Sequence, residues 1–235
     1  MSKTVVVTGC TKGIGLAVAK AFASAGYQVA GCARNIAELA ALKQELHQIN
    51  PMGIHTLLPC DVSDTPQLKQ FIAQVNQVYQ SVQVLVNNAG VFLPGSLITE
   101  AEGVLENLLQ TNVTSAYHVT RGLLPAMLQN KSGHVFNICS IASLQAYDAG
   151  ASYTISKFAL LGFSKQLRHE TKGTGVKVTA LMLGATLTNS WAGANLPEER
   201  FIKSEDVAQT ILGVCELSNH ADVEEIVIRP QLGDI

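Results

Sequence analysis

Two residues four positions apart, Tyr153 and Lys157, have the types and the spacing to move a proton. On a helix this spacing brings both side chains to one face. A phenol titrates at about pH 10, and a nearby ammonium group favours the phenolate and lowers the phenol pKa. A tyrosine tuned in this way could protonate a carbonyl oxygen or deprotonate an alcohol. The pattern alone is common on helix surfaces, so its meaning depends on the rest of the chain.

A glycine-rich turn near the start of the chain could bind a phosphate group. It follows Val5-Val6-Val7, which predicts a buried strand, and it precedes a helical pattern. Glycine tolerates positive φ and lets the backbone approach a ligand, and a helix start offers unpaired N–H groups to a pyrophosphate. This context predicts dinucleotide binding. The residues expected to contact the cofactor here are Gly9, Thr11, Lys12, Gly13, Ile14 and Gly15.

Strand and helix patterns alternate along the whole chain. Strands are expected at 5–7, 28–33, 54–59, 82–86, 134–138, 176–182 and 225–228. Helices are expected at 14–25, 36–49, 66–79, 102–128, 153–171 and 204–217, with Asp64 and Ser204 as N-caps. Continuous Val, Ile and Leu in short strands indicate burial on both faces. We therefore expect one α/β domain over 1–235, a Rossmann-type doubly wound parallel sheet of about seven strands with helices on both faces.

Composition narrows the class of protein. The 235 residues are 47% hydrophobic and 14% charged, which fits one globular domain. The formal net charge of -2 leaves no basic surplus for nucleic acid. We see no secretory signal and no apolar run of membrane-spanning length, so we expect a cytoplasmic protein without a membrane partner. The five cysteines and six histidines lack paired spacings, and we expect neither disulfides nor a metal site.

Combined with four further motifs, the glycine turn resembles that of the short-chain dehydrogenase/reductase family. The turn has the form Thr-Gly-x-x-x-Gly-x-Gly, and the other motifs follow in the family's order. They are Asp61-Val62 after the third strand, Asn87-Asn88-Ala89-Gly90 after the fourth, Asn112 in the long helix, and Ser140 thirteen positions before Tyr-x-x-x-Lys. The match runs from Val5 to about Thr188. One departure is Leu183-Gly184, where the family usually has Pro-Gly.

This resemblance implies a role for each matching residue. Tyr153 would be the acid/base, and Ser140 would hydrogen-bond the substrate oxygen. Asn112 would hold a water that links Lys157 to solvent, and Lys157 would also hold the nicotinamide ribose. Ser143 lacks the family spacing and is interpreted as a loop-capping serine. The other residues implied to contact the cofactor are Asp61 and Val62 at the adenine, and Asn88, Ala89, Gly90, Gly184, Thr186 and Thr188.

The end of the second strand indicates which nicotinamide cofactor is used. NAD enzymes of this fold place Asp or Glu there to accept a hydrogen bond from the ribose 2′-hydroxyl. Here Ala33 and Arg34 occupy the place, and Lys12 in the glycine turn is a second cation. With no carboxylate expected to repel a 2′-phosphate and a guanidinium available to bind one, the sequence predicts NADP(H).

We therefore expect an oxidoreductase that transfers a hydride between NADP(H) and a small carbonyl or alcohol substrate. A non-catalytic NADP(H)-binding sensor or scaffold is the alternative, since fold does not settle function. A nucleotide-dependent epimerase or dehydratase shares the Tyr–Lys pair but usually has a larger C-terminal domain. The expected pocket walls are 91–96, 141–147 and 189–203, the last of which belongs to a substrate loop at 184–203, and they are largely apolar. Two helices are apolar on several faces, which predicts a homodimer or homotetramer.

Overall fold

A computed structural model describes residues 3–188, 191 and 196–235. Within these residues the strands form one seven-stranded sheet in the order β3-β2-β1-β4-β5-β6-β7, and each neighbouring pair is parallel. The strands are β1 (Thr4–Thr8), β2 (Gln28–Ala33), β3 (Thr56–Pro59), β4 (Val84–Asn87), β5 (Gly133–Ser140), β6 (Val176–Leu183) and β7 (Glu225–Ile228). The expected doubly wound Rossmann-type sheet is confirmed.

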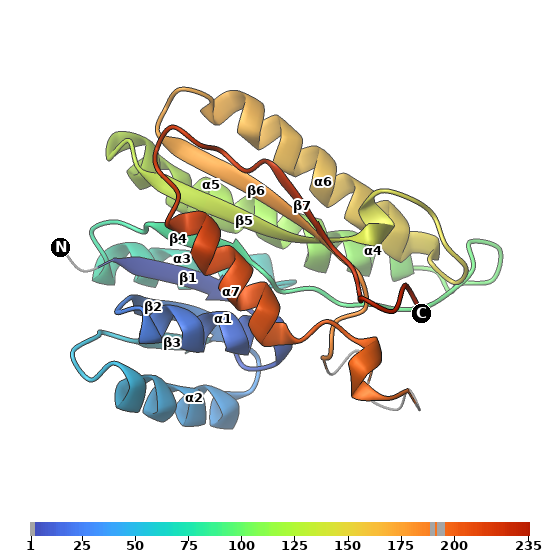
Figure 1. Cartoon of the computed structure of the whole chain (residues 1–235), viewed down its shortest axis with the longest axis horizontal. Coiled ribbons are helices and arrows are strands. Elements are labelled where there is room, and N and C mark those ends of the chain that lie inside the picture. Colours follow the sequence, from blue (N-terminus) through green and yellow to red (C-terminus); the bar gives the residue numbers. More distant parts are fainter. Residues whose placement is uncertain (1–2, 189–190, 192–195) are drawn as a thin grey trace.

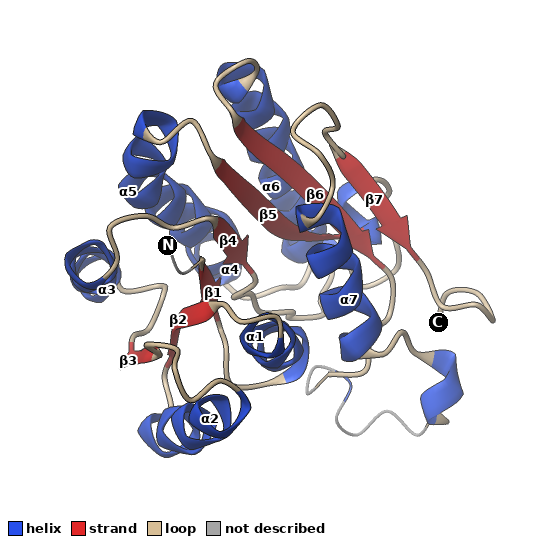
Figure 2. Cartoon of the chain, turned by 60° about the vertical axis from the view of Figure 1, so that its left-hand side comes forward, coloured by secondary structure: helices blue, strands red, loops and turns tan. Residues whose placement is uncertain are grey.

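Helices cover both faces of the sheet (Figure 1, Figure 2). On one face lie α1 (Gly13–Ser24), α2 (Ile36–Ile49) and α7 (Ser204–Cys215). On the other lie α3 (Thr65–Val78), α4 (Val104–Leu109), α5 (Ser115–Gln129) and α6 (Ala151–Thr171). No helix among these residues combines the length and the apolar character needed to cross a bilayer.

The central strand β1 shows why the strand sequences are continuously apolar. Val5 and Val7 are fully buried against Val18 and Phe22 of α1 and their neighbours. Val6 points to the opposite face and packs in the second core layer, with residues of α3 and α5 such as Phe71. Because side chains alternate along a strand, a strand covered on both faces needs apolar residues at every position.

Two expectations about helices were wrong in detail. The helix expected at 102–128 is α4 and α5 joined by a π-helical turn at Gln110–Thr114, and it runs past Pro125 to its end at Gln129. Ser204 is not the N-cap of α7, because Lys203 takes that position and the Ser204 hydroxyl donates to the carbonyl of Leu187 at 3.0 Å. The Asp64 cap of α3 is confirmed, since its carboxylate accepts from the Gln67 N–H.

The strand order reverses between β1 and β4, and in such sheets a crevice opens at the carboxyl ends of the two strands. Asn88, just after β4, fastens these ends together. Its Nδ2 donates to the carbonyls of Thr8 at 2.9 Å and Gly9 at 3.1 Å. In return the Thr8 hydroxyl oxygen accepts from the N–H groups of Asn88 and Ala89. The asparagine therefore holds the glycine turn in place beside the crevice.

Candidate active site

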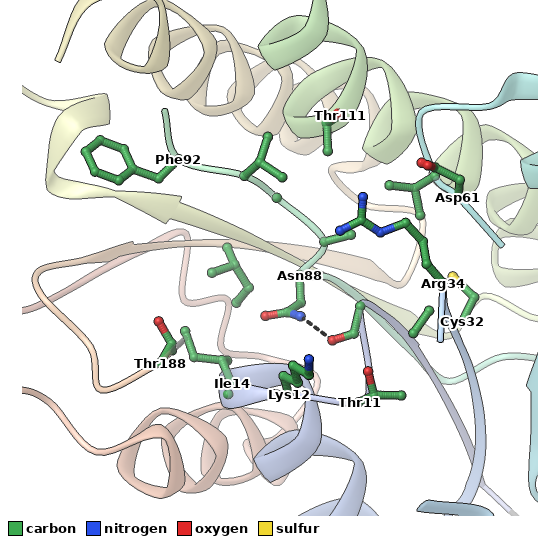
Figure 3. Close-up of a pocket in the computed structure, with 18 of the residues that line it drawn as sticks. Thr11, Lys12, Ile14, Cys32, Arg34, Asp61, Asn88, Phe92, Thr111 and Thr188 are labelled. Carbon is green, nitrogen blue, oxygen red and sulfur yellow. Dashed lines mark hydrogen bonds between the residues drawn. The ribbon is translucent and has the colours of Figure 1, made fainter. Parts of the chain in front are cut away.

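A cleft of about 590 Å³ opens at the carboxyl ends of β1 and β4 (Figure 3). It is lined by most of the residues that the sequence predicted as cofactor contacts: Gly9, Thr11, Lys12, Gly13, Ile14, Arg34, Asp61, Val62, Asn88, Ala89, Gly90, Tyr153, Lys157 and Thr188. Sequence reasoning missed a second set that also lines it: Cys32, Asn35, Glu38, Cys60, Thr111 and Ile138. Among the described residues, no group of three His, Cys, Asp or Glu side chains could hold a metal ion.

The glycine positions of the turn leave little room for a Cβ atom. Gly9 and Gly13 have φ of 67° and 50°, the left-handed region that favours glycine. A Cβ at Gly13 would lie 2.8 Å from the Thr188 Cγ2, and a Cβ at Gly15 would lie 2.1 Å from the Gly9 carbonyl oxygen. Gly15 therefore closes the turn from behind, without lining the cleft. The N-cap residue of α1 is Lys12, whose side chain has no acceptor for the first N–H groups of the helix. The glycine turn and the start of α1 together form a site that fits a pyrophosphate.

Lys157 lines the inner end of the cleft, and Asn112 lies buried beside Gly90. The buried Lys157 ammonium donates to the carbonyl oxygen of Ile138 at 2.9 Å, and burial lowers the Lys157 pKa. The Asn112 side chain holds Val91 from both sides, with Oδ1 accepting from its N–H at 2.8 Å and Nδ2 donating to its carbonyl at 3.0 Å. Nδ2 also donates to the Ser156 hydroxyl. The π-helical turn thus positions an amide that joins the end of β4 to α6.

Tyr153 comes from the first turn of α6 and packs edge-on against Phe92, with ring centroids 4.9 Å apart. Burial raises the Tyr153 pKa to about 12, and a hydrogen bond with Ser140 counteracts this only partly. The expectation that Lys157 lowers this pKa is wrong for the cleft as it stands. The ammonium lies 5.6 Å from the Tyr153 ring centroid, where it bonds to a backbone carbonyl, and desolvation of the phenolate dominates.

Ser140 ends β5, directly beside Tyr153. Its Oγ accepts from the N–H of Ala142 at 3.1 Å, and this bond leaves the hydroxyl proton available for donation. The hydroxyl oxygen of Ser143 accepts from the Ser140 N–H at 3.3 Å, and Ser143 is buried. The interpretation of Ser143 as a loop-capping serine is confirmed.

The end of the cleft beside Arg34 contains a carboxylate that the sequence did not predict there. Glu38 accepts hydrogen bonds from the Lys12 ammonium at 2.8 Å and the Thr11 hydroxyl at 3.0 Å. The hydrogen bond from Lys12 is the main cause of the lowered Glu38 pKa. Asn35 is the N-cap of α2, so Glu38 is the third helical residue and reaches back toward the turn. An Asn-x-x-Glu capping pattern was the available signal.

Beyond β6, only Thr188 of the three predicted residues lines the cleft. Gly184 donates its N–H to the carbonyl of Ile228 at 2.8 Å, and Thr186 is buried with its hydroxyl on the Gly184 carbonyl. Both residues therefore support the strand end instead of lining the cleft. In the expected substrate loop, 189–190 and 192–195 lie outside the described residues.

Comparisons with known proteins agree with this geometry. The profile of the short chain dehydrogenase family matches residues 3–199. An uncharacterized oxidoreductase of Staphylococcus aureus (strain USA300) is 27% identical over 97% of both chains. The structure of a metagenomic short-chain oxidoreductase in complex with NADP has a TM-score of 0.84 at 28% identity, covering 97% of each chain. A variant of actinorhodin polyketide ketoreductase with NADPH has a TM-score of 0.88 at 27% identity, covering 100% of this chain and 98% of that one.

Proposed function

This chain belongs to the short-chain dehydrogenase family and is an oxidoreductase of that family, and from this premise we propose that it uses NADP(H) to reduce a carbonyl compound to an alcohol, with Tyr153 as the acid. The observation that carries the proposal is that Tyr153 and Lys157 line a cleft that also contains the glycine turn, and that Ser140 is hydrogen-bonded to Tyr153. A binding protein without catalysis has no need of this reactive set.

The residues of the cleft fit NADP(H). The glycine turn and the start of α1 would hold the pyrophosphate, and Arg34 and Lys12 would face the 2′-phosphate. Asp61, whose carboxylate is fixed by the N–H and hydroxyl of Ser63, would lie beside the adenine with Val62. Both solved structures described above contain NADP or NADPH, which supports the same cofactor here.

The protonation state of Tyr153 favours reduction. When bound, the cofactor supplies the hydride that reduces the carbonyl carbon. With a pKa of about 12, the phenol keeps its proton at neutral pH and can donate it to the carbonyl oxygen. An alkoxide is a stronger base than a phenolate, so this transfer is favourable. The Ser140 hydroxyl would donate to the same oxygen, and the Lys157 ammonium would stabilise the phenolate that remains.

The substrate side of the cleft supports an apolar carbonyl compound. Phe92 lines the cleft beside Tyr153, and Leu93, Leu144 and Tyr147 are partly exposed on the segments that flank it. Two carboxylates belong to the neighbouring segments: Glu100 accepts a hydrogen bond from Ser152 at the start of α6, and Asp148, the residue after Tyr147, is exposed. The apolar side chains of Phe92, Leu93 and Leu144 favour ketones, aldehydes or quinones over charged substrates.

The substitution Tyr153→Phe tests the proposal, on any substrate found by NADPH loss with a panel of ketones, aldehydes, quinones and 3-oxoacyl thioesters. Turnover should fall by roughly 10²–10⁴-fold, because the substitution removes the transferred proton and keeps the ring packing. NADPH affinity, measured by titration calorimetry, should stay within about twofold since the glycine turn and Arg34 hold the cofactor. Tyr117→Phe, which removes a phenol from the outer face of α5, should leave turnover unchanged. Near-normal turnover of Tyr153→Phe would exclude the acid role, and NADPH binding without any turnover would favour a sensor.

A further inference from the structure

Four charged side chains meet at the end of the cleft beside β2, and their formal charges cancel. Lys12 and Arg34 are the cations, and Glu38 and Asp61 are the anions. Lys12 is paired with Glu38 at 2.8 Å. Arg34 lies on the Asp61 side of the cleft (Figure 3), and in the described part of the chain no carboxylate oxygen comes within ion-pair distance of it. An entering phosphate would therefore meet one available cation and one occupied cation.

We propose that Glu38 is a cofactor-selectivity residue that limits the preference for NADPH over NADH, because its carboxylate competes with the 2′-phosphate of the cofactor for the Lys12 ammonium. The proposal rests on the proposed use of a nicotinamide cofactor in this cleft. The choice between the two cofactors then depends on a residue of α2 as well as on the cations Lys12 and Arg34.

The Glu38 carboxylate is fixed by three donors, two from the glycine turn and one from the N-cap of α2. Lys12 and Thr11 reach it from the glycine turn, at 2.8 and 3.0 Å, and the Asn35 side-chain amide donates to it at 3.1 Å. Turning the carboxylate away from the cleft would break all three hydrogen bonds. Glu38 therefore stays beside the turn when a cofactor enters, and its charge has to be accommodated.

The negative charge of Glu38 affects the binding of NADPH and NADH differently. NADPH carries a dianionic phosphate where NADH has a neutral hydroxyl group. If Lys12 moves to the phosphate, its ion pair with Glu38 is lost, and if Lys12 bridges both anions, the carboxylate and the phosphate lie close and repel one another. Either arrangement weakens NADPH binding and leaves NADH binding unaffected. Both Lys12 and Glu38 are partly exposed, with 54% and 30% of their side chains accessible, so solvent screening keeps the effect moderate.

The experiment compares Glu38→Gln with the unmodified protein in titrations of NADPH and of NADH. Glutamine keeps one acceptor oxygen, which can serve Thr11 or Asn35, and removes the charge. The NADPH dissociation constant should fall by roughly three- to tenfold, and that of NADH should change by less than about twofold. The gain should shrink as salt is added, since screening weakens exposed charges.

Two further variants separate this proposal from a structural effect. Glu45→Gln is the matched control, because Glu45 and Lys20 form a 2.6 Å ion pair that also joins α2 to α1, outside the residues that line the cleft. It should change neither affinity. In a Lys12→Met background the gain from Glu38→Gln should become smaller, as a double-mutant cycle requires when two residues act together.

Other results would overturn the proposal. Weaker NADH binding with unchanged NADPH binding would make Glu38 an acceptor for the ribose 2′-hydroxyl. Weaker NADPH binding would mean that Glu38 holds the Lys12 ammonium in the position that binds the 2′-phosphate. If neither dissociation constant changed, Glu38 would serve only to cap the start of α2. The use of NADP(H) is tested separately from the role of Glu38. An unmodified protein that binds NADH alone would contradict the NADP(H) assignment. A gain of NADPH affinity in Glu38→Gln would even then support the role of Glu38.

Discussion

At the scale of the residue, burial decides the charge of Tyr153. Its pKa of about 12 lies above the ordinary value for a phenol, so the group stays protonated from neutral pH to well above pH 10. We expect the near-ultraviolet difference spectrum between the unmodified protein and Tyr153→Phe, without cofactor, to show a phenolate signal only above about pH 11. A signal with its midpoint between about pH 7 and 9 would show instead that Lys157 controls the titration.

The cleft residues also show what a sequence can and cannot predict about a site. Gly9 was predicted from the glycine turn that follows the first strand, and Asn88 and Tyr153 from motifs that resemble those of the short-chain dehydrogenase/reductase family; Gly9, Asn88 and Tyr153 all line the cleft. Glu38 was missed, because its carboxylate enters the cleft from one turn inside a helix. Which partner a side chain chooses depends on its rotamer and on neighbours from other elements, and neither can be read from spacing.

At the scale of the element, the backbone of the glycine turn depends on glycine at a specific position. A Cβ at Gly15 would lie 2.1 Å from the Gly9 carbonyl oxygen and 2.5 Å from the Asn88 side-chain nitrogen. Gly15→Ala should therefore displace the turn, lower the free energy of unfolding by about 1–3 kcal/mol and weaken NADPH binding at least tenfold. Chemical denaturation and cofactor titration measure the two effects.

The control for this prediction is Gly213→Ala in α7, where a Cβ would meet no atom within 4 Å. An alanine there should leave cofactor binding unchanged and stabilise the protein by up to about 1 kcal/mol, since it lowers the entropy of the unfolded chain. If Gly15→Ala bound NADPH as well as the Gly213→Ala variant does, the close packing of the turn would have no role in cofactor binding.

The helix around Asn112 shows where sequence periodicity reaches its limit. One helix was expected at 102–128, but the structure inserts a π-helical turn at Gln110–Thr114. The apolar pattern does not reveal one extra residue, because α4 and α5 each keep an apolar face across it. The turn buries Thr111 and Asn112 and brings the Asn112 amide to Val91. The energy of these hydrogen bonds, made to a distant segment, outweighs the regular helical bond that the turn gives up.

At the scale of the whole molecule, α5 and α6 leave part of their apolar surface uncovered. The sequence predicted an oligomer because both helices carry apolar residues on several faces. In the structure some of these residues are buried inside the chain, and others are exposed. Leu108 and Leu161 are buried inside the chain. Tyr117, Ile155 and Phe158 remain 39%, 41% and 46% exposed. The rings of Tyr117 and Phe163 lie 6.0 Å apart and join the two helices into one surface on the same side of the sheet (Figure 2).

A second copy of the chain would bury this surface, and we expect a homodimer or homotetramer in sedimentation velocity at micromolar concentration. The physical reason is that a helix with apolar residues outside its own core contact gains free energy from a further partner. Phe158→Glu puts a charge on this exposed apolar surface and should shift the protein to monomers with an unchanged far-ultraviolet circular dichroism spectrum. Met52→Glu replaces a 92% exposed side chain in the loop after α2 and should leave the assembly as it is. An unmodified protein that sediments as a monomer, or a Phe158→Glu variant that assembles normally, would show that this surface is not an interface between copies of the chain.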